Sequence, residues 1–283
     1  MFDFPESWIF AWDIMKFIDG IVDWVVITFE PFFHAFNIFI LRGFLVPFSD
    51  FLTWIPWWAT ILLIGLASWR VVNRRFALLS VGFMLIINLT GLHELSMMTL
   101  AITLTSTILC VIMGIPLGIF AARSNWFNTL LKPILDGMQT MPSFVYLIPA
   151  LMIFGLGKTP AVMATVIYAI PPMIRLTNLG IRQVDPQLME ASLSFGTTPW
   201  QTLRKVQIPL AMPTILAGIN QTIMMALSMV VLASMIGAKG VGTEVLAGIN
   251  RLEVGRGFLG GIAIVFLAII LDRISQGIAK KNQ

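Results

Sequence analysis

Few residues of this chain could do chemistry on their own, and one pattern among them suggests a nucleotide site. Gly157-Lys158-Thr159 has the order that ends a phosphate-binding loop, which also needs a glycine five positions before Gly157. That position is Met152, so we expect no ATP site here. The single cysteine, Cys110, lies inside an apolar stretch, which argues against a disulfide framework. We therefore expect no catalytic residue and no metal site in this chain.

The elements that would position any functional group are predicted to be membrane helices. Hydrophobic residues make up 58% of the 283 residues and charged residues 11%, and the mean hydropathy is +0.89. A soluble domain carries about 25% charged residues, so the composition predicts a polytopic membrane protein. A crossing takes about 20 residues, and seven apolar stretches are candidates. They lie near 55–69, 76–89, 95–122, 130–154, 160–176, 212–236 and 257–274.

Basic residues predict the orientation, because cytoplasmic loops are rich in Lys and Arg. If 182–205 is cytoplasmic, 12 of the 18 Lys and Arg residues lie inside and 6 outside. We therefore expect the N-terminus outside and the C-terminus in the cytoplasm of a multi-pass inner-membrane protein. No ionisable residue lies in the middle of a predicted span, whereas proton-coupled transporters need such groups. The energy for transport is thus expected to come from another protein.

A polar segment between two long apolar stretches has the pattern of a helical hairpin. Asp185-Pro186 predicts a helix start, because aspartate caps the first turn and proline needs no N–H donor there. Gly196 predicts the end of that helix, because the residue just after a helix often takes positive φ, which glycine adopts most easily. Thr198-Pro199 predicts a second start. Helical spacing places these residues on the apolar faces of the two helices: Leu188, Ala191, Ser192 and Phe195 on the first, and Trp200 and Leu203 on the second.

Such a hairpin exposes hydrophobic side chains that fit a groove on another protein. The segment resembles the EAA loop of ABC-importer permeases, which reads Glu-Ala-Ala, three residues, Gly, nine residues, and then aliphatic, any residue, aliphatic and Pro. The matching positions are Glu190, Ala191, Ser192, Gly196, Val206, Ile208 and Pro209. Ser192 is the one departure, a small residue in place of another. In that family the loop docks into the ATPase subunit, so the resemblance implies this coupling role for Glu190, Ala191, Ser192, Gly196 and Pro209.

Longer stretches resemble the permease of glycine betaine/proline betaine importers. They are DGMQTMPSFVYLIPALMIFGLGKTPAV (136–162), IPPMIRLTNLGIRQV (170–184), PLAMPTILAGINQTIMMALSMVVLASMIGAKGVG (209–242) and AIILDRISQ (268–276). The resemblance covers about 95–276 and implies an all-α membrane protein with the five-helix core of a type I, methionine-importer-like permease. It also implies two permease copies, two ATP-binding subunits that hold ATP and Mg, and a separate substrate-binding protein. This chain would itself be no enzyme and hold no cofactor.

The sequence leaves the transported solute open. Aromatic cages commonly hold methylated ammonium groups, and the chain is rich in Phe and Trp, but composition cannot locate a cage. Glycine betaine, proline betaine, choline, carnitine, trimethylamine oxide and a sulfonium analogue all remain candidates. An ion-coupled secondary transporter of similar solutes is the alternative, although it predicts intramembrane charges that the sequence lacks.

Residues 1–53 differ from the rest because seven acids alternate there with Trp and Phe. A span in this region would bury charged groups at a cost of about 3 kcal/mol or more each. We therefore favour an amphipathic scaffold in the outer interface over an eighth span. We expect two peripheral spans in 54–94, the core in 95–276 with the coupling loop at 182–209, and a cytoplasmic tail at 277–283. The acids are Asp3, Glu6, Asp13, Asp19, Asp23, Glu30 and Asp50.

Prolines and glycines interrupt the last five predicted spans, and broken helices are how transporters expose backbone polar groups. We expect the pathway where two permease copies meet, with hydrogen bonding between helices as the alternative role for its polar groups. Its candidate residues are Met138, Thr140, Met141, Phe144, Asn220, Met224, Met225 and Ser228. The outer segment 239–256 offers mixed charges for docking the binding protein, an ordinary solvated loop being the alternative. Its candidates are Lys239, Glu244, Arg251 and Arg256.

Overall fold

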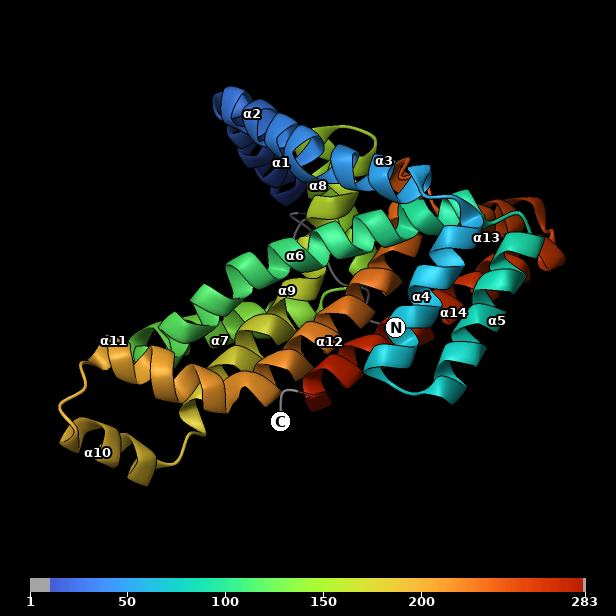
Figure 1. Cartoon of the computed structure of the whole chain (residues 1–283). Coiled ribbons are helices and arrows are strands. Elements are labelled where there is room, and N and C mark those ends of the chain that lie inside the picture. Colours follow the sequence, from blue (N-terminus) through green and yellow to red (C-terminus); the bar gives the residue numbers. More distant parts are fainter. Residues whose placement is uncertain (1–10, 282–283) are drawn as a thin grey trace, which may run out of the picture.

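The computed structural model describes the backbone of residues 11–281, and the regular elements of that part are all helices (Figure 1). This confirms the predicted all-α class. Asp3, Glu6 and Trp8 lie outside the described residues, as do 282–283 of the predicted tail. In chain order the helices are α1 (Ala11–Thr28), α2 (Glu30–Ile40), α3 (Val46–Trp54), α4 (Trp57–Val71), α5 (Arg74–Leu89), α6 (His93–Arg123), α7 (Asn125–Thr140), α8 (Leu147–Phe154), α9 (Lys158–Arg182), α10 (Pro186–Ser194), α11 (Pro199–Thr202), α12 (Ile208–Ala233), α13 (Val241–Arg251) and α14 (Val254–Lys281).

Short tight or wide helical turns join several of these helices. The 3-10 turns are Ser143–Tyr146, before α8, and Ser234–Ile236, after α12. The π-helical turns are Leu41–Leu45, between α2 and α3, and Leu203–Gln207, between α11 and α12. The chain therefore runs as helix without a loop from Pro199 to Ile236.

Five helical segments of the described chain are long and apolar enough to cross a membrane, and the bent pair of α7 and α8 brings the number to six. Helices α4 and α5 have 15 and 16 residues, which is about 23 Å of helix against about 30 Å of hydrocarbon. The two peripheral spans in 54–94 therefore stay a prediction. The five segments are Glu30–Trp54, His93–Arg123, Lys158–Arg182, Pro199–Ile236 and Val254–Ala279.

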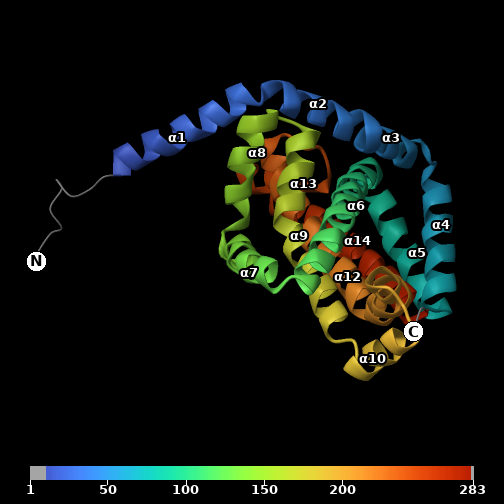
Figure 2. The same ribbon diagram turned by 90° about the vertical axis from the view of Figure 1, so that its left-hand side faces the viewer.

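Helices α1, α2 and α3 form an arch across one end of the bundle, whereas α4 and α5 run beside it (Figure 2). The arch is held by the α8 end, where the ring of Phe154 lies 5.9 Å from that of Phe33 and 6.3 Å from that of Phe36. Lys158, at the start of α9, donates from Nζ to the Oγ of Ser49 at 3.4 Å. This crossing arrangement suits an interfacial scaffold. The scaffold stays a prediction, because Glu30–Trp54 also has the length and composition of a span.

Close packing of α6 against α9 forms the centre of the bundle. A Cβ atom built on Gly118 would lie 2.5 Å from the Cβ of Thr177, and one on Gly114 would lie 2.7 Å from the Cγ of Met173. Small residues four positions apart let membrane helices approach in this way. A third helix, α12, packs on α9 in the same bundle.

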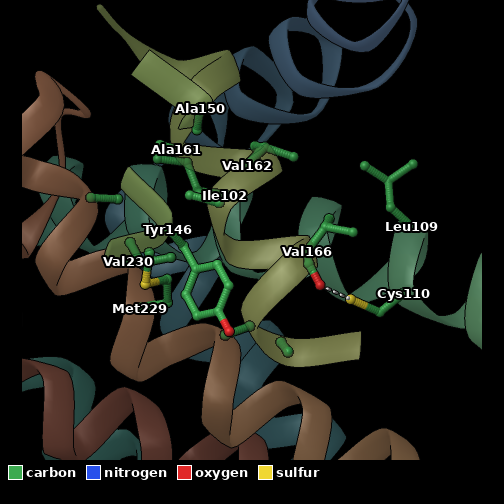
Figure 3. Packing of buried hydrophobic residues seen from close by; sticks show 14 of the residues in the cluster. Ile102, Leu109, Cys110, Tyr146, Ala150, Ala161, Val162, Val166, Met229 and Val230 are labelled. Atoms are coloured by element: carbon green, nitrogen blue, oxygen red, sulfur yellow. Dashed lines mark hydrogen bonds between the residues drawn. The ribbon is translucent and has the colours of Figure 1, made fainter. Parts of the chain in front are cut away.

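Polar and apolar side chains both stabilise this interior. Thr103 and Thr107 are buried and donate to the carbonyls one turn before them, each at 2.8 Å. Thr99 accepts from the backbone N–H of Val241 at 2.9 Å and so ties α6 to the start of α13. Figure 3 shows the apolar part, in which the ring of Tyr146 lies among residues of α9 and α12. Thr99, Thr103 and Thr107 therefore use their hydroxyl groups for bonds within the bundle.

Candidate functional site

The predicted hairpin is present: α10 projects beyond the helix bundle, and α11 leads into α12 (Figure 1). The carboxylate of Asp185 accepts from the N–H of Gln187 at 2.9 Å and caps α10. Gly196 has φ +73°, the left-handed conformation that the sequence predicts for it. Thr198 and Gln201 cap α11 reciprocally, with N–H to side-chain distances of 3.3 and 2.8 Å. Two short capped helices therefore meet at a glycine turn.

Three hydroxyl groups close the hairpin from inside. The Oγ of Ser192 lies 2.7 Å from the Oγ1 of Thr197 and 3.0 Å from that of Thr202, and the two threonine oxygens are 2.8 Å apart. Thr197 also donates to the carbonyl of Ser192 at 2.8 Å. Ser192 and Thr202 are buried. The serine that departs from the Glu-Ala-Ala pattern thus fastens α10 to α11.

Large apolar side chains cover the outside of the hairpin. Phe195 is 89% exposed and Trp200 63% exposed. Glu190, Ala191 and Pro209 are exposed as well. A cleft of about 540 Å³, lined in part by Glu190, separates the hairpin from the ends of α6 and α9. This surface can seat in a groove of another protein.

The structure differs from the predicted apolar faces at two residues. Ser192 turns inward to the hydroxyl cluster and does not share the exposed face of Phe195. Leu203 is 1% exposed and packs with Ile181 and Ile215 in the bundle, so it lies apart from Trp200. The reason is that Leu203 opens the π-helical turn at which the chain re-enters the bundle. Through this turn, the hairpin continues directly into α12.

A sharp bend interrupts the predicted span 130–154. Helix α7 and the segment Ser143–Phe154 meet at 108°. The carbonyl of Met138 would normally accept the N–H four residues later, but that residue is Pro142, which has no N–H. The hydroxyl of Tyr146 donates to this carbonyl at 2.5 Å instead. Tyr146 is 6% exposed, so its hydroxyl satisfies a carbonyl that proline would otherwise leave without a partner.

The structure places the predicted pathway residues around this bend and on one face of α12. Thr140, Met141 and Phe144 are exposed, and Met138 packs partly buried on the core. On α12, Met224 and Ser228 are exposed on the same face as Ala217 and Gln221, while Met225 packs on the core. The 3-10 turn Ser143–Tyr146 contacts α12. The two predicted segments therefore meet at this turn, and each carries exposed side chains within one chain.

Asn220 has a different environment from the other candidates. Its Nδ2 donates to the carboxylate of Asp272 at 2.9 Å, and the hydroxyl of Ser275 donates to its Oδ1. Gln276 donates to the same carboxylate at 2.7 Å. Asn220 therefore has the role predicted as the alternative to lining the pathway: it forms hydrogen bonds between helices and joins α12 to α14.

Sequence reasoning did not single out Asp272, although it lies in the AIILDRISQ stretch (268–276). A carboxylate near the end of an apolar span was the available signal, since such groups need partners. Its partners are the side-chain amides of Asn220 and Gln276. Within residues 11–281 no three His, Cys, Asp or Glu side chains gather as metal ligands.

The predicted docking residues surround α13. Glu244 and Arg256 form a two-pronged ion pair, with N–O distances of 2.5 and 3.1 Å, and Arg256 also reaches Glu253 at 3.4 Å. Hydrogen bonding from Arg256 holds the pKa of Glu244 below its ordinary value. Lys239 and Arg251 are exposed. The four candidates thus divide into a pair that joins α13 to α14 and two cations that a partner could reach.

Comparison with known proteins gives consistent results along most of the chain. A family described as "Binding-protein-dependent transport system inner membrane component" matches residues 114–282. The glycine betaine/proline betaine transport system permease protein ProW of Escherichia coli is 46% identical over 265 residues, which cover 93% of this chain and 74% of ProW. The glycine betaine/carnitine transport permease protein GbuB of Listeria monocytogenes is 48% identical over 273 residues, 95% of this chain and 96% of GbuB.

Solved structures show the same fold at lower identity. An inward-facing structure of the MetNI methionine ABC transporter has a TM-score of 0.59 and 21% identity, and the match covers 66% of this chain and 93% of that chain. A crystal structure of an amino acid ABC transporter has a TM-score of 0.52 and 24% identity, and the match covers 70% of this chain and 96% of that chain. These matches confirm the predicted type I importer architecture for the helical core.

Proposed function

The chain belongs to the family of binding-protein-dependent transport system inner membrane components, and we propose that it takes up small betaine-type zwitterions or quaternary amines. It is the transmembrane permease of an ABC importer, as the family and its relatives show. The names of those relatives support the solute class, because they specify glycine betaine together with proline betaine or carnitine. Choline, trimethylamine oxide and sulfonium analogues belong to the same chemical class.

We infer three kinds of partner. There would be two ATP-binding subunits, which hold ATP and Mg. Each would seat on the hairpin of one permease copy, around Glu190, Ala191 and Phe195. A second copy of the permease would cover the exposed residues of the α7–α8 bend and of α12. A separate substrate-binding protein would deliver the solute at the outer end, where Lys239 and Arg251 are accessible. The orientation that this needs, N-terminus outside and C-terminus in the cytoplasm, is supported by the excess of Lys and Arg on the hairpin side.

The observation that carries the coupling proposal is the unbroken helical path from the hairpin into the bundle. ATP binding and hydrolysis on the partner would move α10 and α11 as one body, because the hydroxyls of Ser192, Thr197 and Thr202 join them. The π-helical turn Leu203–Gln207 passes this motion to α12. Helix α12 carries Met224 and Ser228, so its movement would change the surface that the solute meets.

Gly196 offers a direct test of coupling. A Cβ atom at this position meets nothing within 4 Å, so the obstacle that the structure shows for a substitution is the φ of +73°. An L-residue pays about 1–2 kcal/mol in this conformation, and a β-branched residue more. Gly196→Val should therefore lose solute-driven ATP hydrolysis and uptake in vesicles. Gly196→Asn is the matched control, because asparagine tolerates the left-handed conformation, and should keep most of both.

Two outcomes would contradict the proposal. Normal uptake by Gly196→Val, with full stimulation of the ATPase, would remove the coupling role of the hairpin. Uptake that follows an ion gradient in vesicles without the ATPase would favour a secondary transporter. The solute itself is identified by the compound that raises the melting temperature of the cognate binding protein.

A further inference from the structure

A second cleft lies between α7 and α9, on the side of the bundle that carries the hairpin. Its volume is about 480 Å³. The polar part of its wall consists of Asn128, Lys132, Asp136, Arg175, Asn178 and Arg182. The remaining wall is aliphatic and consists of Leu131, Leu135, Ile174, Leu176 and Leu179. The cleft therefore has one polar and charged part and one apolar part.

Hydrogen bonds hold the polar groups of this cleft in place. Arg182 donates from Nε to Asn178 at 2.9 Å and from a terminal nitrogen to the carbonyl of Ala121 at 2.8 Å. Asn178 donates in turn to Asn128 on α7 at 2.8 Å. Arg175 pairs with Asp136 through one terminal nitrogen. The guanidinium groups are thus fixed by protein partners before any ligand arrives.

Several donors of the cleft remain free for a ligand. Lys132 makes no hydrogen bond or ion pair within the described part of the chain, and further N–H groups of Arg175 and Arg182 have no partner there. Three cations against the single carboxylate of Asp136 give the cleft a net charge of +2. A ligand for it therefore carries an anionic group that accepts several hydrogen bonds, as a phosphate does.

The aliphatic walls and the position in the membrane point to one source of such a group. Arg182 ends α9 next to the hairpin, which places the cleft at the cytoplasmic surface if the proposed orientation holds. Anionic lipids concentrate in this leaflet, and basic pockets between membrane helices hold their headgroups. Trp126, which is 74% exposed on α7, suits the lipid–water interface. A free phosphate ion has no apolar part that could pack against the five aliphatic side chains.

We propose that the α7–α9 cleft binds the phosphate of an anionic phospholipid, with Lys132, Arg175 and Arg182 around the headgroup and the leucines along the acyl chains. This inference rests on the proposed orientation, but not on the identity of the transported solute. It gives α7, the first half of the bent pair, a contact with the membrane surface as well as with α9.

The test compares lipid retention by purified transporter complexes. The complex is reconstituted in phosphatidylcholine vesicles with increasing phosphatidylglycerol, re-extracted, and its bound phosphatidylglycerol is measured by mass spectrometry. Lys132→Gln combined with Arg175→Gln should weaken retention roughly 30-fold, since a basic residue near a charged surface contributes about 1 kcal/mol. The matched control is Arg70→Gln with Arg273→Gln, two exposed arginines outside the cleft, and should retain the lipid.

Three results would overturn the site. Equal loss in both double variants would show a general charge effect, and no loss in either would remove the cleft from lipid binding. Displacement of the lipid by inorganic phosphate at low concentration would assign the cleft to a free anion. Because retention is measured without transport, a complex that holds the lipid but imports no betaine would contradict the proposed function and leave the site intact.

Discussion

The hydroxyl of Tyr146 is expected to hold the bend between α7 and α8. It is the group that satisfies the carbonyl of Met138, whose usual partner is removed by Pro142. Tyr146→Phe keeps the buried ring and takes away only this donor. A buried acceptor left without a partner costs about 1–3 kcal/mol, which is the upper range for this partly buried bond. We therefore expect the free energy of local opening at the bend to fall by about this amount, while the bundle around the bend stays folded.

Hydrogen–deuterium exchange measures this effect directly. A loss of 1–3 kcal/mol corresponds to roughly 5- to 100-fold faster exchange of local amides, at tenfold for each 1.4 kcal/mol. The increase should be confined to amides near the bend, such as Met141, which donates to Gly137 at 3.1 Å. Amides of α6 and α12 should exchange as before.

The chain provides its own control for this variant. It has two tyrosines, and the ring of Tyr168 lies 6.1 Å from that of Tyr146. The hydroxyl of Tyr168 makes no hydrogen bond with any residue that the structure describes. Tyr168→Phe should therefore leave exchange near the bend unchanged. Equal rates in the wild type and Tyr146→Phe, or equal increases in both variants, would refute the reasoning from the missing proline N–H.

Three further predictions follow from other parts of the structure. Replacing both Lys239 and Arg251 by Glu should raise the binding-protein concentration needed for half-maximal uptake, most strongly at low salt. An unchanged concentration would argue against docking at these residues. Arg256 is left intact because it pairs with Glu244. Since its folded-state pKa is lowered, Glu244 contributes stability above the ordinary glutamate range and loses it only as pH falls through the lowered value. Amide exchange in α13 should thus accelerate only in that acidic range, whereas Arg256→Gln should accelerate it at neutral pH too. Gly118→Ala should lower the melting temperature of the detergent-solubilised permease because its Cβ would lie 2.5 Å from that of Thr177, whereas Gly82→Ala, where a Cβ meets nothing within 4 Å, should not.

The hairpin shows how far local sequence rules reach. Caps and a positive-φ glycine are decided by residues within four positions of each other, so Asp185, Gly196 and Thr198 could be placed without any tertiary information. The all-α class and the importer family could also be predicted, because long apolar stretches and long motif matches survive in a single sequence. Local rules failed at Leu203, where re-entry into the bundle, and not helical spacing, sets which side is buried.

The partners of single side chains depended on contacts that lie far apart along the chain. Nothing in the sequence pairs Asn220 with Asp272, which are 52 positions apart, or Arg182 with the carbonyl of Ala121, 61 positions away. Such choices are made when helices pack and each buried polar group must find a donor or acceptor. For the same reason the sequence could list Glu244 and Arg256 as docking charges but could not show that they bind each other.

The sequence by itself therefore determined the helices, their interruptions and the hairpin between Asp185 and Thr202, because these follow from apolar length, proline, glycine and caps. Tertiary structure alone decided which polar groups face a neighbouring helix and which stay available to a partner or a lipid. It also decided that the proline break at Pro142 bends by 108° and is satisfied by Tyr146. A missing N–H can be read from a sequence, whereas the hydroxyl that replaces it is selected by packing.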